Sequence, residues 1–155
     1  MTHRHGFTRI EAPIFIVLVA TLGWSVVPGC GGQRVVGPDP QLLRREAELR
    51  ATLQQLRDAV ALFLSDTGAY PCFLSEITKP ASEAPERGLH PEDGYVVPIN
   101  PSDYRGPYIT TPCGGLPWDP IHGNRDWVYP GFPPHLGQVF AWGGRASDGT
   151  DYSTW

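Results

Sequence analysis

The sequence lacks concentrated charge and lacks recognisable catalytic motifs. Only 18% of its 155 residues are charged, and Lys79 is the single lysine among twelve basic residues. The arginines are scattered along the chain, which excludes the basic stripe that nucleic-acid-binding proteins present. The sequence has no nucleophile elbow, phosphate-binding loop or metalloprotease helix. We therefore predict that the protein is not an enzyme and does not bind nucleic acid.

Long regular elements are also scarce in the expected globular part. The chain contains 18 Gly and 17 Pro, which favour turns and interrupt helices and strands. Its length allows one compact domain plus a terminal segment, because single domains commonly have about 100 to 150 residues. We expect one loop-rich domain.

An uncharged apolar run, Ala12–Val27, follows a short polar stretch that contains Arg4 and Arg9. A helix over residues 7–27 would rise ~31 Å, close to the ~30 Å thickness of membrane hydrocarbon. Since the positive charges precede the run, residues 1–6 are expected to stay in the cytoplasm while the remainder crosses the membrane. The pattern predicts one transmembrane helix and an extracytoplasmic domain.

The residues at the start of this run resemble the processing site of type IV pilins and pseudopilins. The motif is Gly6-Phe7-Thr8-Arg9-Ile10-Glu11, followed at once by the apolar run. The resemblance implies that prepilin peptidase cleaves after the leader, residues 1–6, and that Phe7 becomes an N-methylated terminus. A carboxylate at the centre of a bilayer costs ~2.5–3.5 kcal/mol unless it is partnered. By resemblance, Glu11 pairs with the terminal amine of a neighbouring subunit and sets the register of a filament.

Two alternatives to this processing remain open. Val27-Pro28-Gly29-Cys30 is similar to a lipobox, in which Cys30 would be diacylated and become the N-terminus of a lipoprotein that presents a periplasmic or surface binding domain. An ordinary cleaved signal peptide is the third interpretation. Pro28 fits a lipobox poorly and Glu11 would be unexplained, so we favour pilin-like processing over both, in which case Cys30 is a free thiol.

A helix is predicted from about Pro40 to Thr67, after a Gly/Pro-rich linker or melted helix at residues 28–40. Asp39 is a suitable N-cap, Pro40 suits the first helical position, and Gly68 is a suitable C-cap. The apolar residues recur at helical spacing and predict a face that packs on a sheet: Leu42, Leu49, Leu53, Leu56, Val60 and Phe63.

The rest of the chain resembles the major pseudopilin of type II secretion in the order of its motifs. These are Phe63–Pro71 with its Asp-Thr-Gly-Ala-Tyr-Pro ending, Gly106-Pro107-Tyr108, Pro117-Trp118-Asp119-Pro120, Gly123-Asn124 and Trp127-Val128-Tyr129. Residues 72–105 match poorly and are expected to form a divergent variable loop. The resemblance implies an inner-membrane, single-pass subunit of a periplasmic filament, with prepilin peptidase, copies of itself, other pseudopilins and the assembly platform as partners.

The fold class that follows is α+β, pilin-like, with a domain at residues 41–155. Asp126–Tyr129 and Gln138–Trp142 are rich in aromatic and β-branched residues and are expected to be strands. A small antiparallel sheet needs an apolar cover, and the helix over residues 40–67 has a suitable length to provide it.

Asp148-Gly149-Thr150-Asp151 resembles the acidic loop with which many major pseudopilins bind calcium. Carboxylates on a turn offer the hard oxygen ligands that calcium prefers. Asp148 and Asp151 are therefore the candidate ligands, and a solvated Asp-Gly turn is the alternative.

The cysteines, histidines and tryptophans of the domain carry further expectations. An exported domain permits a disulfide between Cys72 and Cys113, which we favour over free thiols. His90, His122 and His135 are too widely spaced to indicate a metal site, so surface or structural roles are expected. Aromatic residues on short strands are usually core, and we favour this for Trp118, Trp127, Trp142 and Trp155. The alternative is that they line a groove for a carbohydrate or a protein.

The chemical identity of the mature N-terminus tests the processing model. We expect mass spectrometry of the purified protein to find a chain that begins at Phe7 and carries one methyl group. Gly6→Leu should leave the leader attached, whereas Cys30→Ser should change nothing but the mass of one side chain. An intact Met1, or a lipid on Cys30, would contradict the model.

Overall fold

The computed structural model describes residues 37 and 39–155. Its main element is the helix α1, Pro40–Thr67. The Asp39 side chain accepts a hydrogen bond from the Gln41 N–H at 2.9 Å. At the other end Gly68 adopts a left-handed conformation, φ 72°, and its N–H donates to the Leu64 carbonyl at 2.8 Å. The predicted helix and both of its caps are confirmed.

One face of α1 forms the centre of the core. Its residues at helical spacing are almost completely shielded from solvent: Leu49, Leu53, Leu56, Val60 and Phe63 are 0–1% exposed. The Phe63 ring meets the rings of Tyr104 and Tyr108 edge to face, with centroids 5.7 and 5.9 Å away. Such aromatic pairs add ~0.5–1.5 kcal/mol to the gain from burial alone.

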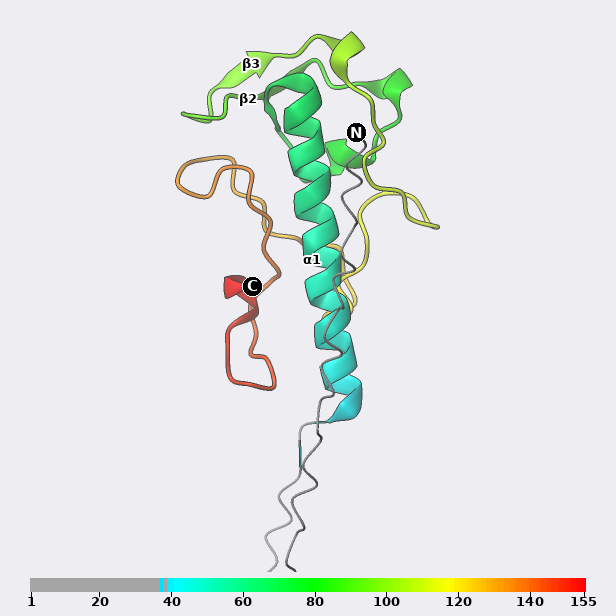
Figure 1. The fold of residues 1–155 in the computed structure, drawn as a ribbon, viewed down its shortest axis with the longest axis vertical. Coiled ribbons are helices and arrows are strands. Elements are labelled where there is room, and N and C mark those ends of the chain that lie inside the picture. Colours follow the sequence, from blue (N-terminus) through cyan, green and yellow to red (C-terminus); the bar gives the residue numbers. More distant parts are fainter. Residues whose placement is uncertain (1–36, 38) are drawn as a thin grey trace, which may run out of the picture. The chain divides into compact units, whose positions relative to one another are not determined.

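A small sheet lies at the C-terminal end of α1, as Figure 1 shows. It consists of β1 (Tyr70–Pro71), β2 (Arg87–Leu89) and β3 (Val96–Pro98), antiparallel in the order β1-β2-β3. Gly88 in β2 faces the core, where an added Cβ would come within 2.7 Å of Ala69 and Ile99 side-chain atoms. The glycine therefore lets β2 lie against the core, and the predicted α+β class, a long helix packed on a small antiparallel sheet, is confirmed.

The position of this sheet corrects the sequence prediction. Two of its strands lie within residues 72–105, which were expected to be a variable loop. The predicted strands Asp126–Tyr129 and Gln138–Trp142 are joined only by a single antiparallel bridge between Val128 and Phe140. The burial still alternates along residues 138–142, with Val139 and Ala141 buried. The carbonyl of Val139, however, bonds to Arg57 of α1 rather than to a strand.

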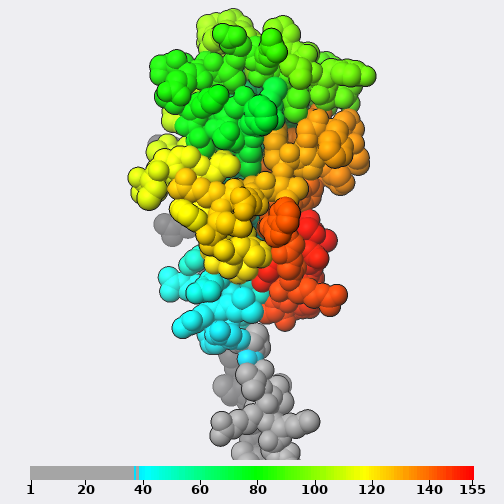
Figure 2. Space-filling model, turned by 180° about the vertical axis from the view of Figure 1, so that it is seen from behind, coloured from blue at the N-terminus to red at the C-terminus, as the bar shows by residue number. Residues whose placement is uncertain are grey.

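The remaining covering of α1 is irregular chain with four short 3₁₀ helices. They are Leu74–Thr78, Ala81–Glu83, Pro101–Asp103 and Tyr152–Thr154. Figure 2 shows the molecule of Figure 1 from behind, where the yellow and orange segments cover α1. Tyr104 ties two of these pieces together, because its hydroxyl donates to the carbonyls of Glu76 and Lys79 at 2.9 and 2.6 Å. Its burial raises the pKa of Tyr104 to about 12.

Two neighbouring helix positions test which face of α1 holds the fold together. Phe63→Ala should lower the free energy of unfolding by about 3–5 kcal/mol, because it opens a cavity between the helix and the two tyrosines. Leu62→Ala is the matched control, because Leu62 is 53% exposed, and it should change stability by less than about 0.5 kcal/mol. Urea titration of the full chain measures the free energy of unfolding of both variants. Equal losses of this free energy would contradict the assignment of the core face.

Candidate functional site

The segment from Val139 to Trp155 lies beside the N-terminal half of α1, at the opposite end from the sheet (Figure 1). Glu46 of α1 reaches into it. One carboxylate oxygen accepts from the Ser147 N–H at 2.6 Å and from the Tyr152 hydroxyl at 3.3 Å. The other accepts from the Ser147 hydroxyl at 2.7 Å. Glu46 thus joins the helix to residues about a hundred positions later in the chain.

Glu46 is a buried carboxylate that is balanced by neutral hydrogen-bond donors. It is 3% exposed, and no basic side chain that the structure describes forms an ion pair with it. The hydrogen bond from the Ser147 hydroxyl, together with those from the Ser147 N–H and the Tyr152 hydroxyl, outweighs the effect of burial and holds the pKa of Glu46 below its ordinary value. Since each donor belongs to the C-terminal segment, the charged form of Glu46 favours the docked segment.

Two arginines extend the same attachment along the helix. The Arg57 guanidinium donates to the Val139 carbonyl at 2.9 and 3.1 Å, and also to the carbonyl of Trp155. The Arg50 guanidinium lies over the Trp155 ring, 3.8 Å from its centroid. Cation–π contacts of this kind contribute ~0.5–1 kcal/mol at exposed sites. We call Glu46, Arg50 and Arg57 with their partners in residues 139–155 the C-terminal clasp.

The calcium candidates Asp148 and Asp151 both lie in the clasp, on the turn closed by the Arg145–Asp151 bridge. Asp148 accepts from the N–H and hydroxyl of Thr150, and Asp151 from those of Ser153. These hydrogen bonds lower the pKa of both carboxyls. The part of the chain that the structure describes brings no three acidic, histidine or cysteine side chains together as a metal site. The turn holds the two carboxylates ionised, and calcium binding stays a prediction.

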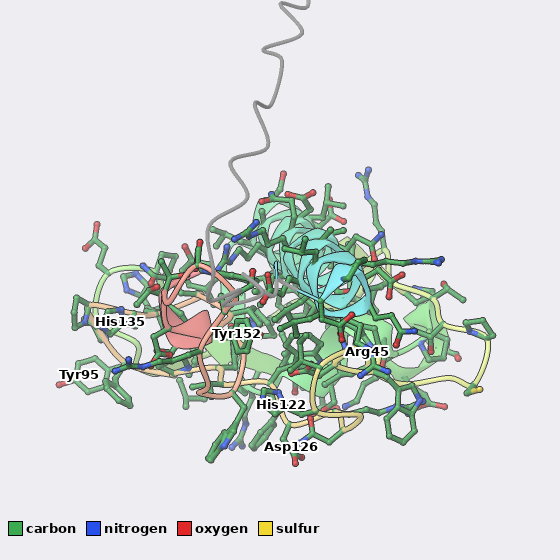
Figure 3. All side chains as sticks on the ribbon, turned by 90° about the horizontal axis from the view of Figure 1, so that it is seen from below. Arg45, Tyr95, His122, Asp126, His135 and Tyr152 are labelled. Atoms are coloured by element: carbon green, nitrogen blue, oxygen red, sulfur yellow. The ribbon has the colours of Figure 1, made fainter. Side chains whose placement is uncertain are left out.

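A second buried carboxylate supports the clasp from the side. Asp119 is 2% exposed, and its oxygens accept from the N–H groups of Ile121 and His122 and pair with the His122 ring at 2.8 Å. The His122 ring meets Tyr152 edge to face, with centroids 6.2 Å apart. In the view of Figure 3, His122 lies between Tyr152 and Asp126. His90 and His135 pair within their own turns, with Asp93 and Gln138.

The two cysteines of the domain are free thiols in the structure, so the expected disulfide is not formed there. Cys72 follows β1 in the sequence and is half-buried, and its burial raises the pKa of the thiol. Cys113 lies in an exposed turn, in which the Gly114 N–H donates to the Thr111 carbonyl. The sequence separation alone therefore did not reveal that the two side chains occupy different surroundings.

The tryptophans divide into two groups, which corrects the expectation that all four are core. Trp127 and Trp155 are half-buried against the core, whereas Trp118 and Trp142 are 57% and 58% exposed. Trp142 lines an apolar groove of about 560 Å³ with Val128 and Phe140. The alternation along residues 138–142 explains this, because it turns Val139 and Ala141 inward and Trp142 outward.

Several predicted site residues lie outside the described residues: Gly6, Phe7, Glu11 and Cys30, together with the leader, the membrane run and nearly all of the linker. Among the helices of the described part, none is long and apolar enough to cross a membrane.

Sequence reasoning missed Glu46, although the sequence carried a signal for it. The spacing of the buried apolar stripe continues through Leu42, Glu46, Leu49 and Leu53. Glu46 therefore places a charged side chain at a core position. A buried charge at such a position requires partners. Those partners could not be found from the sequence, since they lie about a hundred residues away.

Comparison of the chain with protein-family models, with curated proteins and with solved structures finds no match.

The pH dependence of stability tests the role of Glu46. Because its pKa is lowered on folding, its contribution is present above the unfolded value of about 4.3 and is lost as pH falls through the lower folded value. Glu46→Gln should lower Tm at pH 7 by a few degrees, about 2–4 °C for a chain of this size, and should weaken the fall of Tm below pH 5. Glu48→Gln is the control, because Glu48 is on the same helix and half-exposed. Tm is measured by thermal unfolding followed by near-ultraviolet circular dichroism. Equal changes in Tm for the two variants would contradict the role of Glu46 in the clasp.

Proposed function

We propose that the protein is a structural subunit of a type II secretion pseudopilus or a related type IV filament. The observation that carries the proposal is the junction of Gly6, Phe7 and Glu11 with the uncharged run Ala12–Val27. A leader that ends in glycine, an acid at the fifth position after it and a spanning apolar run together suit cleavage before the run and retention of the helix. None of the alternatives accounts for Glu11.

In this function the chain inserts as a single-pass protein of the inner membrane with its domain in the periplasm. Prepilin peptidase removes residues 1–6, and the assembly platform and other pseudopilins receive the mature subunit. Glu11 neutralises the amine of Phe7 on a neighbouring copy. Such a pair removes an unpartnered charge from lipid, which favours one register over others.

The described domain supports a pilin-like fold. One 28-residue helix follows the membrane run in sequence, carries the core on one face and turns at Gly68 into a small sheet. The C-terminal clasp then fixes the end of the described chain to the same helix through Glu46, Arg50 and Arg57. A subunit held in this way would transmit contacts made by its C-terminal turn directly to α1, which the linker joins in sequence to the membrane run.

The second candidate is a lipoprotein that presents a binding domain at the membrane surface. Cys30 after Val27-Pro28-Gly29 favours it, and the exposed Trp118 and Trp142 would suit a binding surface. Palmitate labelling that disappears in Cys30→Ser would select this candidate and exclude the filament proposal.

Calcium is part of the proposal through Asp148 and Asp151. Each uses one carboxylate oxygen to order its own turn. The second oxygen of Asp151 is left to a cation, whereas that of Asp148 lies 3.9 Å from an Arg50 terminal nitrogen, so calcium would displace this ion pair. Calcium would then stabilise the same turn that the clasp holds to α1.

Removal of the Glu11 charge tests filament assembly. Glu11→Gln keeps the size of the side chain and should still be inserted and cleaved. Its cross-linked oligomers in membranes should fall by at least about tenfold, since ~1.4 kcal/mol corresponds to tenfold and the lost pair is worth more. Glu48→Gln, on the exposed side of α1, is the matched control. Oligomers of Glu11→Gln as abundant as those of the unaltered chain would overturn the proposal.

Calorimetric titration of the full chain tests the metal. Calcium should bind with a Kd of about 10⁻⁴–10⁻³ M, the range of extracellular modules, and should raise Tm in proportion to its occupancy. Asp148→Asn should abolish the heat, whereas Asp126→Asn, an exposed acid outside the clasp, should preserve it. An unaltered chain that gives no heat and no gain in Tm would reject the calcium role without affecting the filament proposal.

A further inference from the structure

The loop 117–127 is closed at two levels. The Asp119 N–H donates to the Asn124 carbonyl at 2.7 Å. Nearer its base, the Trp127 indole N–H donates to the Pro117 carbonyl at 2.9 Å. The buried carboxylate of Asp119 orders the turn between them. The backbone of this loop is therefore ordered before any partner arrives, which reduces the entropy lost on binding.

Two of those side chains face each other. The Arg125 guanidinium lies over the ring of Trp118, with its central carbon 4.9 Å from the ring centroid. The Trp118 side is open to solvent, since the residue is 57% exposed. Gly115, at φ 68°, allows the backbone to approach, because an added Cβ would lie 3.0 Å from an Arg125 terminal nitrogen. The loop and the glycine together hold the cation against the indole.

Arg125 has no polar partner among the residues that the structure describes. Its Nε atom is buried and has no hydrogen-bond partner, and it is the one buried side-chain polar atom of which this is true within residues 39–155. No carboxylate that the structure describes forms an ion pair with Arg125. The adjacent acid, Asp126, accepts instead from the Asn124 side chain at 3.1 Å and lies at the outer edge of the domain in Figure 3. An unpaired buried donor costs ~1–3 kcal/mol, so this one calls for an explanation.

We propose that Arg125 and Trp118 form a recognition site for a carboxylate on a partner polypeptide. A guanidinium carries five N–H donors in a planar fork that matches a carboxylate. The ring satisfies the charge over the face of that fork but offers its donors no lone pairs. Because Nε is itself shielded from solvent, an incoming carboxylate would bond to the terminal nitrogens of the fork. Arg125 supplies one positive charge, which equals the charge of one carboxylate and falls short of that of a phosphate. The exposed indole adds apolar contact beside the charge, and Trp and Arg are both enriched among the residues that dominate binding energy. The proposal does not rest on filament assembly.

Nuclear magnetic resonance of the full chain in detergent micelles tests the site, with sodium acetate as the probe. Acetate should shift the Arg125 Nε–H and the Trp118 indole N–H resonances in a saturable way, and sodium chloride of equal ionic strength should not. Arg125→Gln should abolish the Trp118 shift. Arg125→Lys keeps the charge but loses the fork, and should weaken acetate binding by about tenfold.

Arg105→Gln is the matched control, because Arg105 is an exposed arginine outside the loop, and it should leave the acetate shifts unchanged. Inorganic phosphate is the competing probe. Phosphate binding tighter than acetate would overturn the carboxylate assignment, and so would shifts no larger than those in chloride. If Arg125→Gln does not fold, an acetate affinity of Arg125→Lys equal to that of the unaltered chain would overturn the assignment in its place.

Discussion

The domain depends on one constraint, which is that a 28-residue helix must have its apolar face covered along its whole length. Each buried Leu, Val or Phe side chain on that face contributes ~1.5–3 kcal/mol only if water is kept away from it. The sheet is too small to do this, since its three strands have two or three residues each. It lies at the C-terminal end of α1 (Figure 1). Irregular chain covers the rest, including Phe63, which meets Tyr104 and Tyr108.

Irregular chain makes few backbone ladders, so its attachment to the helix must come from side chains. The C-terminal clasp supplies this attachment through Glu46 and Arg57, whose hydrogen bonds go to groups in residues 139–155. A buried carboxylate is favourable only when its hydrogen bonds replace those lost from water. Ser147 and Tyr152 provide them, so the segment has one docked position. The same polar contacts that stabilise the clasp therefore also specify where the acidic turn of Asp148 and Asp151 lies.

The proposed filament function and the proposed carboxylate site place different demands on the domain. A filament subunit needs a rigid connection between its helix and its contact surfaces, which the clasp would provide. A recognition site needs a fixed cation with unfilled hydrogen-bonding capacity, which the closed loop around Arg125 provides. The two features lie on separate segments, so either proposal can fail while the other stands.

The sequence by itself determined the helix, because its caps at Asp39 and Gly68 and its 3.6-residue apolar period act over a few neighbouring residues. It also determined the α+β class, since a one-sided helix of this length requires a cover. Tertiary structure alone decided which residues form that cover. Strands of two or three residues carry too little alternation of apolar and polar residues to be recognised in residues 72–105. The sequence of residues 138–142 also did not show that the Val139 carbonyl would accept from Arg57 of α1 rather than from a neighbouring strand. Tertiary structure also decided the partners of Glu46 and the lone position of Arg125, because a buried polar group finds its partner in space and at any sequence distance.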